Sequence, residues 1–290
     1  MTRLSILFFF WLTLASGVPT YALDEPSCLH GVGKATKKLE GFELQISTYP
    51  DANNPDLDEC EAEIYDARGD VIFSEHDWSF AIELAGVDVN GDGIPDIVLE
   101  AYSGGAHCCW TYYIISLGSK PGLIKKFENN RDAAFFWNKE NRRIEIATRG
   151  GNFDYFDGLC HACAPFPLVY LRLDGTKLID ISSEYVANYD EIIRENRKAL
   201  TSKERQRLSA STEKPSDAEP VVREAVNKTL MIVLAYLYSG REAQARQALQ
   251  DMWPQFDQER IWNLIVETRR NGILCYTRKG AICGEDSAAH

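Results

Sequence analysis

Short runs of alternating apolar and polar residues recur between Lys38 and Tyr185, separated by residues that favour turns. An alternation with a period of two puts the apolar side chains on one face of a β-strand. Asp174-Gly175 and the segment 138–141 have the composition of hairpin turns. The pattern predicts a mainly β domain, built as an antiparallel sandwich or in a partial propeller-like way. The expected strands span 42–49, 60–65, 71–73, 80–84, 97–99, 111–117, 123–127, 133–137, 143–148 and 168–173.

After Tyr185 the pattern changes to one with helical spacing. The segment 190–208 is charged and helix-prone, and 209–220 has the Ser, Pro and Glu bias of a linker. Further helices are expected over 242–252 and 256–268, which predicts a small α-helical C-terminal region. A helix that ends at Gly240 is indicated by apolar residues at Val222, Val226, Leu230, Val233 and Leu237.

The first 22 residues have the features of a secretory signal peptide. Arg3 precedes an apolar run from Leu4 to Leu14, and the segment ends in Thr20-Tyr21-Ala22. The run is shorter than the roughly 20 residues that cross a bilayer, so we expect cleavage and no stable membrane span afterwards. The expected organisation is a signal peptide at 1–22, a β-domain at 23–186, a charged helix and linker at 187–219, and a helical region at 220–290. A secreted or periplasmic location follows.

The net charge limits the classes of partner. The chain carries a formal charge of -12, and loss of Arg3 with the signal peptide makes it -13. Nucleic acids and anionic membranes bind proteins mainly through Lys and Arg, so we expect neither as a partner. An acidic surface favours solubility and cation binding.

The stretch 88–96, DVNGDGIPD, has oxygen ligands at the near-alternate spacing of a calcium loop. Calcium takes six to eight oxygens, and glycine allows a loop to curl around the ion. A β-strand follows, and Leu99 stands where an EF-hand has its bidentate Glu, so this is not an EF-hand. The alternative is an ordinary turn capped by its own Asp and Asn side chains. The candidate calcium ligands are Asp88, Asn90, Asp92, Asp96 and the backbone carbonyl of Ile94.

This D-x-N-x-D-G-x-x-D pattern before an apolar strand resembles the calcium loops of FG-GAP/VCBS repeats, which occur in integrin-alpha-like proteins. The resemblance covers about twenty residues and implies a bound calcium ion. Together with the signal peptide, it leads us to expect an exported, calcium-stabilised module with a binding or structural role. Those repeats usually occur in tandem, whereas one such loop is found here. Separately, 234–254 resembles part of a tetratricopeptide-type helical hairpin, and a small helical cap on the β-domain is the favoured interpretation.

Eight cysteines in an exported chain predict disulfides. Position favours a pair between Cys28 and Cys60 and another between Cys275 and Cys283. Neighbouring strand residues face opposite ways, which predicts that Cys108 and Cys109 each join one of the other two cysteines, Cys160 and Cys163. The alternatives are a vicinal Cys108–Cys109 bridge, which would strain the peptide between them, a tetrahedral zinc site and a redox C-x-x-C motif.

The alternative is an enzyme, a periplasmic metal-dependent hydrolase with zinc. Its candidate catalytic residues are His107, His161 and the acids Asp154 and Asp157. No G-x-S-x-G, H-E-x-x-H or phosphate-binding glycine loop occurs in the chain. We therefore favour a binding or structural role over catalysis. The aromatic loop 150–158, GGNFDYFDG, is expected to be a polar loop with aromatic plugs. The alternative is that Phe153, Tyr155 and Phe156 form a binding surface for a protein or glycan.

Overall fold

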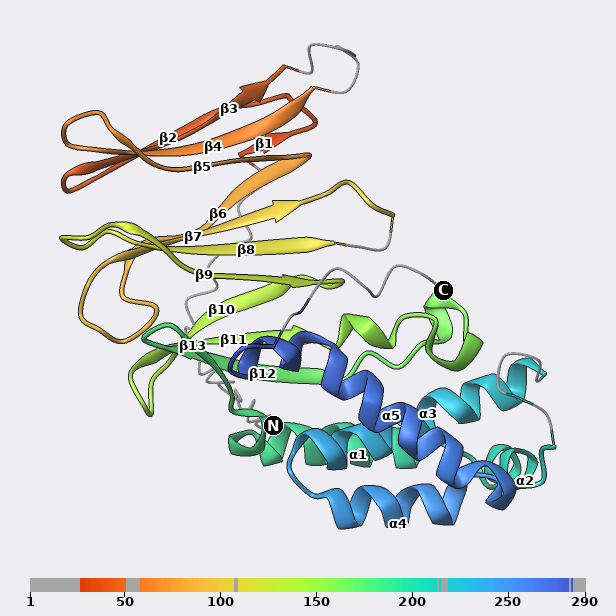
Figure 1. Cartoon of the computed structure of the whole chain (residues 1–290). Coiled ribbons are helices and arrows are strands. Elements are labelled where there is room, and N and C mark those ends of the chain that lie inside the picture. The colour runs from red at the N-terminus through yellow and green to blue at the C-terminus, as the bar shows by residue number, and fades with distance from the viewer. Residues whose placement is uncertain are drawn as a thin grey trace, which may run out of the picture.

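The computed structural model describes residues 27–50, 58–106, 109–212, 214, 219–281 and 283. Within these residues the chain forms three open antiparallel sheets, followed by a helical region (Figure 1). The sheets are stacked in sequence order, and the helices lie beyond the last of them (Figure 1). The prediction of a mainly β fold with a small helical C-terminal region is confirmed.

The first sheet has the order β2-β3-β4-β5. Apolar and polar residues alternate along its strands, which gives the sheet one buried and one outer face. Leu44 pairs with Ile64 on the buried face, and Gln45 pairs with Glu63 on the outer face. The outer face of this central strand pair is polar, so this end of the stack needs no further sheet to cover it. Its strands are β2 (Ala35–Leu39), β3 (Phe42–Tyr49), β4 (Glu59–Asp66) and β5 (Val71–Asp77).

The second sheet, with the order β1-β6-β7-β8-β9, is covered on both faces. Leu99 packs in the core shared with the first sheet, and its neighbour Val98 packs in the core shared with the third. Strands that are buried on both faces need continuous apolar runs, which explains the sequence Ile97-Val98-Leu99 at the start of β7. Its strands are β1 (Cys28–Leu29), β6 (Ser79–Val87), β7 (Asp96–Tyr102), β8 (Trp110–Ser116) and β9 (Gly122–Asn129).

The third sheet has the order β10-β11-β12-β13 and packs between the second sheet and the helices. The rings of Tyr112 and Phe135 join it to the second sheet, with centroids 5.6 Å apart. Tyr189, on the first helix, donates to the Leu168 carbonyl at 2.8 Å and so joins the helices to β12. Its strands are β10 (Ala133–Asn138), β11 (Arg143–Arg149), β12 (Leu168–Asp174) and β13 (Lys177–Asp180).

The helices and the third sheet share one hydrophobic core, to which α3 contributes most. Thr201 accepts from the amide of Glu204, whose side chain accepts from the Thr201 amide, and this capping box begins α2. The single charged helix expected over 190–208 is therefore two helices. The helices are α1 (Val186–Ala199), α2 (Ser202–Ser209), α3 (Pro220–Tyr238), α4 (Glu242–Met252) and α5 (Gln258–Asn271).

The predicted disulfides are present in part. Cys28 is bonded to Cys60 and Cys275 to Cys283, as expected. The expectation that Cys109 joins Cys160 or Cys163 is wrong, because Cys160 and Cys163 are bonded to each other. The two lie in one 3-10 turn, where the Cys163 amide donates to the Cys160 carbonyl at 2.8 Å. Closing so short a loop costs little chain entropy.

Some expectations concern residues outside the described part of the chain. These are the signal peptide at 1–22, His107, Cys108, and positions 213 and 215–218 of the predicted linker. Among the helices that are described, none combines the length and apolar character needed to cross a membrane.

Candidate functional site

The loop that contains the predicted calcium ligands connects β6 to β7, and its own side chains hydrogen-bond to its backbone. The carboxylate of Asp88 accepts from the amides of Gly91 at 2.6 Å and Gly93 at 2.9 Å. Both glycines have positive φ angles, 78° and 83°, which residues with a Cβ atom rarely adopt. The loop therefore curls around the first of the predicted ligands.

The second and third predicted ligands continue the same arrangement. Asn90 donates its side-chain amide to Asp92 at 3.0 Å, and its side-chain oxygen accepts from the Asp92 amide at 3.0 Å. Asp92 in turn accepts from the amide of Ile94 at 2.8 Å. These contacts bring three of the predicted ligands into one small loop and leave lone pairs free on their oxygens.

Asp96 is the unusual member of the set, because its side chain is fully buried with one oxygen unsatisfied. It is 0% exposed. Its Oδ2 accepts from the Val89 amide at 2.9 Å, whereas Oδ1 has no hydrogen-bond partner among the residues that the structure describes. Desolvation raises the pKa of Asp96 to about 6, and the negative charges of Asp92 and Asp88 add to the effect. A buried carboxylate oxygen without a partner is costly unless a cation or proton binds it.

The loop also contacts the third sheet. Arg143 of β11 donates to the Asn90 carbonyl at 2.8 Å and to the Leu173 carbonyl at 3.0 Å. The same carbonyl of Asn90 accepts from the Gly175 amide at 3.0 Å. A Cβ on Gly91 would lie 2.2 Å from the Arg143 guanidinium, so only glycine allows this approach. Order in the loop is thus linked to the packing of the second sheet on the third.

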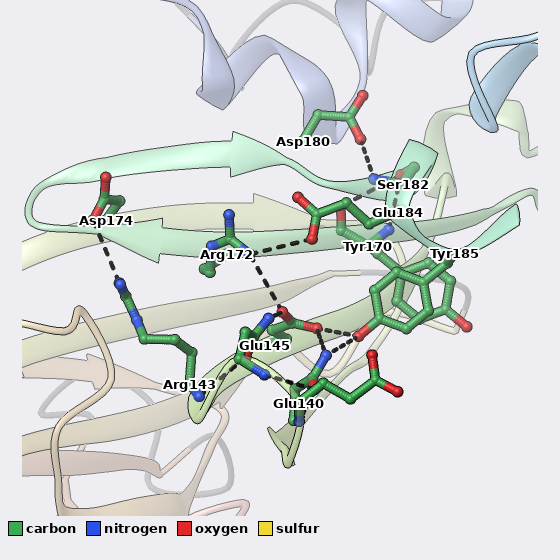
Figure 2. A network of polar contacts seen from close by, with 12 residues as sticks. Glu140, Arg143, Glu145, Tyr170, Arg172, Asp174, Asp180, Ser182, Glu184 and Tyr185 are labelled. Carbon is green, nitrogen blue, oxygen red and sulfur yellow. Dashed lines mark hydrogen bonds and ion pairs between the residues drawn. The ribbon is translucent and has the colours of Figure 1, made fainter.

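Figure 2 shows the polar network that holds the third sheet beside this contact. Arg143 reaches Asp174, and Glu145 lies between Arg172 and Tyr185 (Figure 2). Desolvation opposes ionisation of the fully buried Glu145, but hydrogen bonds from Tyr185, Asn138 and Asn141 outweigh it and hold its pKa below the usual value. The network fixes the strand that carries Arg143.

The donor set of the loop matches the preference of calcium for oxygen. It contains three carboxylates, one amide oxygen and the Ile94 carbonyl. In the described part of the chain, no group of three or more His, Cys, Asp and Glu side chains has the arrangement of a metal site. Asp88 and Asp92 point to backbone amides of their own loop instead. An ion would therefore have to draw these carboxylates toward Asp96.

The aromatic loop 150–158 lies between the third sheet and α5. Phe153 is 0% exposed and Phe156 is 4% exposed, and their rings lie 5.2 Å apart. Tyr155, between them, is 54% exposed and adopts a φ of 51°. Two of the three aromatic residues are thus plugs in the core, and only Tyr155 is available as a surface.

The histidine of the C-x-x-C segment is held on both sides. The Nδ1 atom of His161 lies 2.9 Å from Asp154, and its Nε2 lies 3.2 Å from a guanidinium nitrogen of Arg131. Arginine can only donate, so Nε2 accepts and Nδ1 carries the proton that is donated to Asp154. Because both ring nitrogens are engaged, His161 is poorly placed to act as a general base or zinc ligand.

The second proposed acid has a different partner. Asp157 forms two contacts of 2.7 Å with the guanidinium of Arg260 on α5. The structure thus brings Asp154 to His161 and ties Asp157 to a helix. Neither Arg131 nor Arg260 was identified as part of this region from the sequence, because each comes from a distant segment and no local spacing connects it to the loop.

Comparisons of this chain with protein-family models, with curated proteins and with solved structures find no match.

Proposed function

We propose that this protein is an exported, calcium-stabilised module that works by binding a protein or glycan partner, or as a structural element. The observation that carries the proposal is the buried Oδ1 atom of Asp96, which has no hydrogen-bond partner in the described part of the chain and lies in the same loop as two other acids. A divalent cation would give this oxygen its missing partner and offset the repulsion among the three carboxylates. The resemblance of the loop to FG-GAP/VCBS repeats supports the same assignment.

Calcium would be held by Asp88, Asn90, Asp92 and Asp96, with the carbonyl of Ile94. Its role would be structural, since it would order a loop whose Asn90 carbonyl binds the third sheet through Arg143 and Gly175. Binding energy at such a site adds to the stability of the folded state. The ion would therefore brace the contact between the second and third sheets.

A location outside the cytoplasm is supported by the disulfides and by the signal-type N-terminus. A non-catalytic role is favoured by the engagement of His161 at both ring nitrogens and of Asp157 by Arg260. Within the aromatic loop, Tyr155 is the side chain offered to a partner.

Calcium should raise the melting temperature of the chelator-treated protein by several degrees. An ion at a hundredfold excess over its dissociation constant adds about 2.7 kcal/mol of stability. Asp92→Ala removes a ligand and should abolish this response, measured by differential scanning calorimetry with and without EDTA.

Asp70→Ala is the matched control, because Asp70 is an exposed acid in the turn between β4 and β5. It should keep the full calcium response. A wild-type melting curve that is the same in calcium and in EDTA would refute the calcium site.

A further inference from the structure

The Cys160–Cys163 disulfide differs from the Cys28–Cys60 disulfide in exposure and in loop length. Cys28 and Cys60 are fully buried and 32 residues apart. Cys160 is exposed, Cys163 is half-buried, and the two are separated by 3 residues. A bridge that closes so short a loop restricts the unfolded chain little and stabilises the fold least. Exposed disulfides are also the ones that exchange readily with thiols.

The turn that carries this disulfide is held by contacts that do not need the bridge. Asn227 of α3 donates its side-chain amide to the carbonyls of Cys163 at 3.0 Å and Ala164 at 3.2 Å. The Cys163 amide donates to the Cys160 carbonyl, and the ring of His161 is fixed between Asp154 and Arg131. Reduction of the bridge would leave these contacts in place.

A pocket of about 430 Å³ opens beside the disulfide. Both cysteines line it, and α3 contributes Arg223, Glu224, Asn227 and Lys228 to the lining. A volume of a few hundred Å³ suits a ligand of the size of a short peptide segment. A ligand seated here would lie against the sulfur atoms.

The charged side chains that line the pocket are Arg223, Glu224 and Lys228. The ammonium of Lys228 is 2.7 Å from Glu204 and 3.8 Å from Glu224, so much of its charge is compensated. Arg223 lines the same wall and adds a second positive charge. Cationic neighbours lower the pKa of a thiol and so increase its thiolate fraction.

We propose that Cys160 and Cys163 form a redox-active dithiol/disulfide couple that exchanges with cysteine thiols of a peptide bound in the adjacent pocket. The thiolate of the incoming peptide attacks Sγ of Cys160, the more exposed sulfur. The Cys160–Cys163 bond breaks, a mixed disulfide forms, and Cys163 leaves as a thiolate that takes up a proton. A second peptide thiol then attacks the mixed disulfide, which releases an oxidised peptide and leaves both cysteines reduced.

The test measures how fast each disulfide of the native protein is reduced. The oxidised protein is treated with reduced glutathione, quenched with an alkylating reagent and mapped by mass spectrometry. Cys160 and Cys163 should be labelled at least about tenfold faster than Cys28 and Cys60, as expected for an exposed and unconstrained bridge. The melting temperature of this partly reduced protein should stay within error of that of the oxidised form. Equal labelling rates, or unfolding that accompanies the labelling of Cys160, would overturn the proposal.

Two single variants identify which sulfur forms the mixed disulfide. Cys163→Ser removes the resolving thiol. When this variant is treated with oxidised glutathione, Cys160 should attack one of its sulfurs, release one reduced glutathione and remain in a trapped mixed disulfide with the other. Cys160→Ser leaves only the half-buried sulfur and should trap severalfold less. The wild-type labelling experiment decides the proposal even if a variant does not fold.

Pocket involvement and the source of the thiol are tested together. Arg223→Gln should slow exchange with glutathione severalfold, whereas Arg68→Gln in the turn before β5 should not change the rate. Unchanged exchange in Arg223→Gln would contradict the role of the pocket. A reduced cysteine-containing decapeptide is compared with glutathione. Faster exchange with the decapeptide is expected for a peptide bound in the pocket, and faster exchange with glutathione would overturn a peptide substrate.

Discussion

Phe153→Ala is expected to lower the free energy of unfolding by about 3–5 kcal/mol, the cost of truncating a fully buried aromatic residue to alanine. The ring is 0% exposed and packs against Phe156. It lies in a 3-10 turn, Gly151–Phe153, that contacts α5. The loss therefore affects the junction between the third sheet and the last helix. Urea unfolding monitored by circular dichroism measures it.

Tyr155→Ala is the matched control within the same loop. Because Tyr155 is 54% exposed, its truncation should change the stability by less than about 1 kcal/mol. If instead Phe153→Ala were tolerated as well as Tyr155→Ala, the aromatic loop would be a surface and not a plug.

Asp96→Asn should have opposite effects on stability with and without calcium. The pKa of Asp96 is about 6 in the folded protein, against 3.8 for an ordinary Asp. The folded state thus holds this proton more tightly than the unfolded state. The resulting stability is complete below about pH 4 and is lost as the pH rises through 6, by on the order of 3 kcal/mol. Asn cannot ionise, so the variant in EDTA should not show this loss.

With calcium at neutral pH the order of stability should reverse. The wild type gains the energy of ion binding, while Asp96→Asn lacks the charge that attracts the ion. Protons compete with calcium for Asp96, so the stabilisation by calcium should also weaken below pH 6. Thermal melts of both proteins at pH 4, 6 and 7.5, in EDTA and in calcium, measure these effects. Parallel pH profiles for the two proteins in EDTA would contradict the burial of a charged Asp96.

Alternation along the sequence was sufficient to locate most strands. The segment Phe42–Tyr49 was predicted with its observed bounds, because Leu44 and Ile46 face the core between polar neighbours. The short strand β13 was missed, since four residues carry too little alternation to recognise. The break between α1 and α2 could have been found, because Thr201 and Glu204 have the spacing of a capping box.

The candidate sites were predictable only where the contacts are local. The spacing of the loop acids identified Asp96, but its burial depends on strands that pack around it. Arg143 and Asn90 are 53 residues apart in the sequence, so no local pattern predicts the contact between the guanidinium and the Asn90 carbonyl. Likewise, nothing in the sequence GGNFDYFDG distinguishes the exposed Tyr155 from the two buried phenylalanines. The side chain of Tyr155 is directed outward by a backbone φ of 51°, which the sequence does not reveal.

Direct measurement of calcium binding tests the central claim of a calcium-stabilised module. Chelator-stripped protein is equilibrated with calcium by dialysis at pH 7.5, and the bound ion is counted per chain. We expect one tightly held calcium ion in the wild type, and none at the same free concentration in Asp92→Ala or Asp96→Asn. Absence of bound calcium in the folded wild type, or equal binding by all three proteins, would contradict the account.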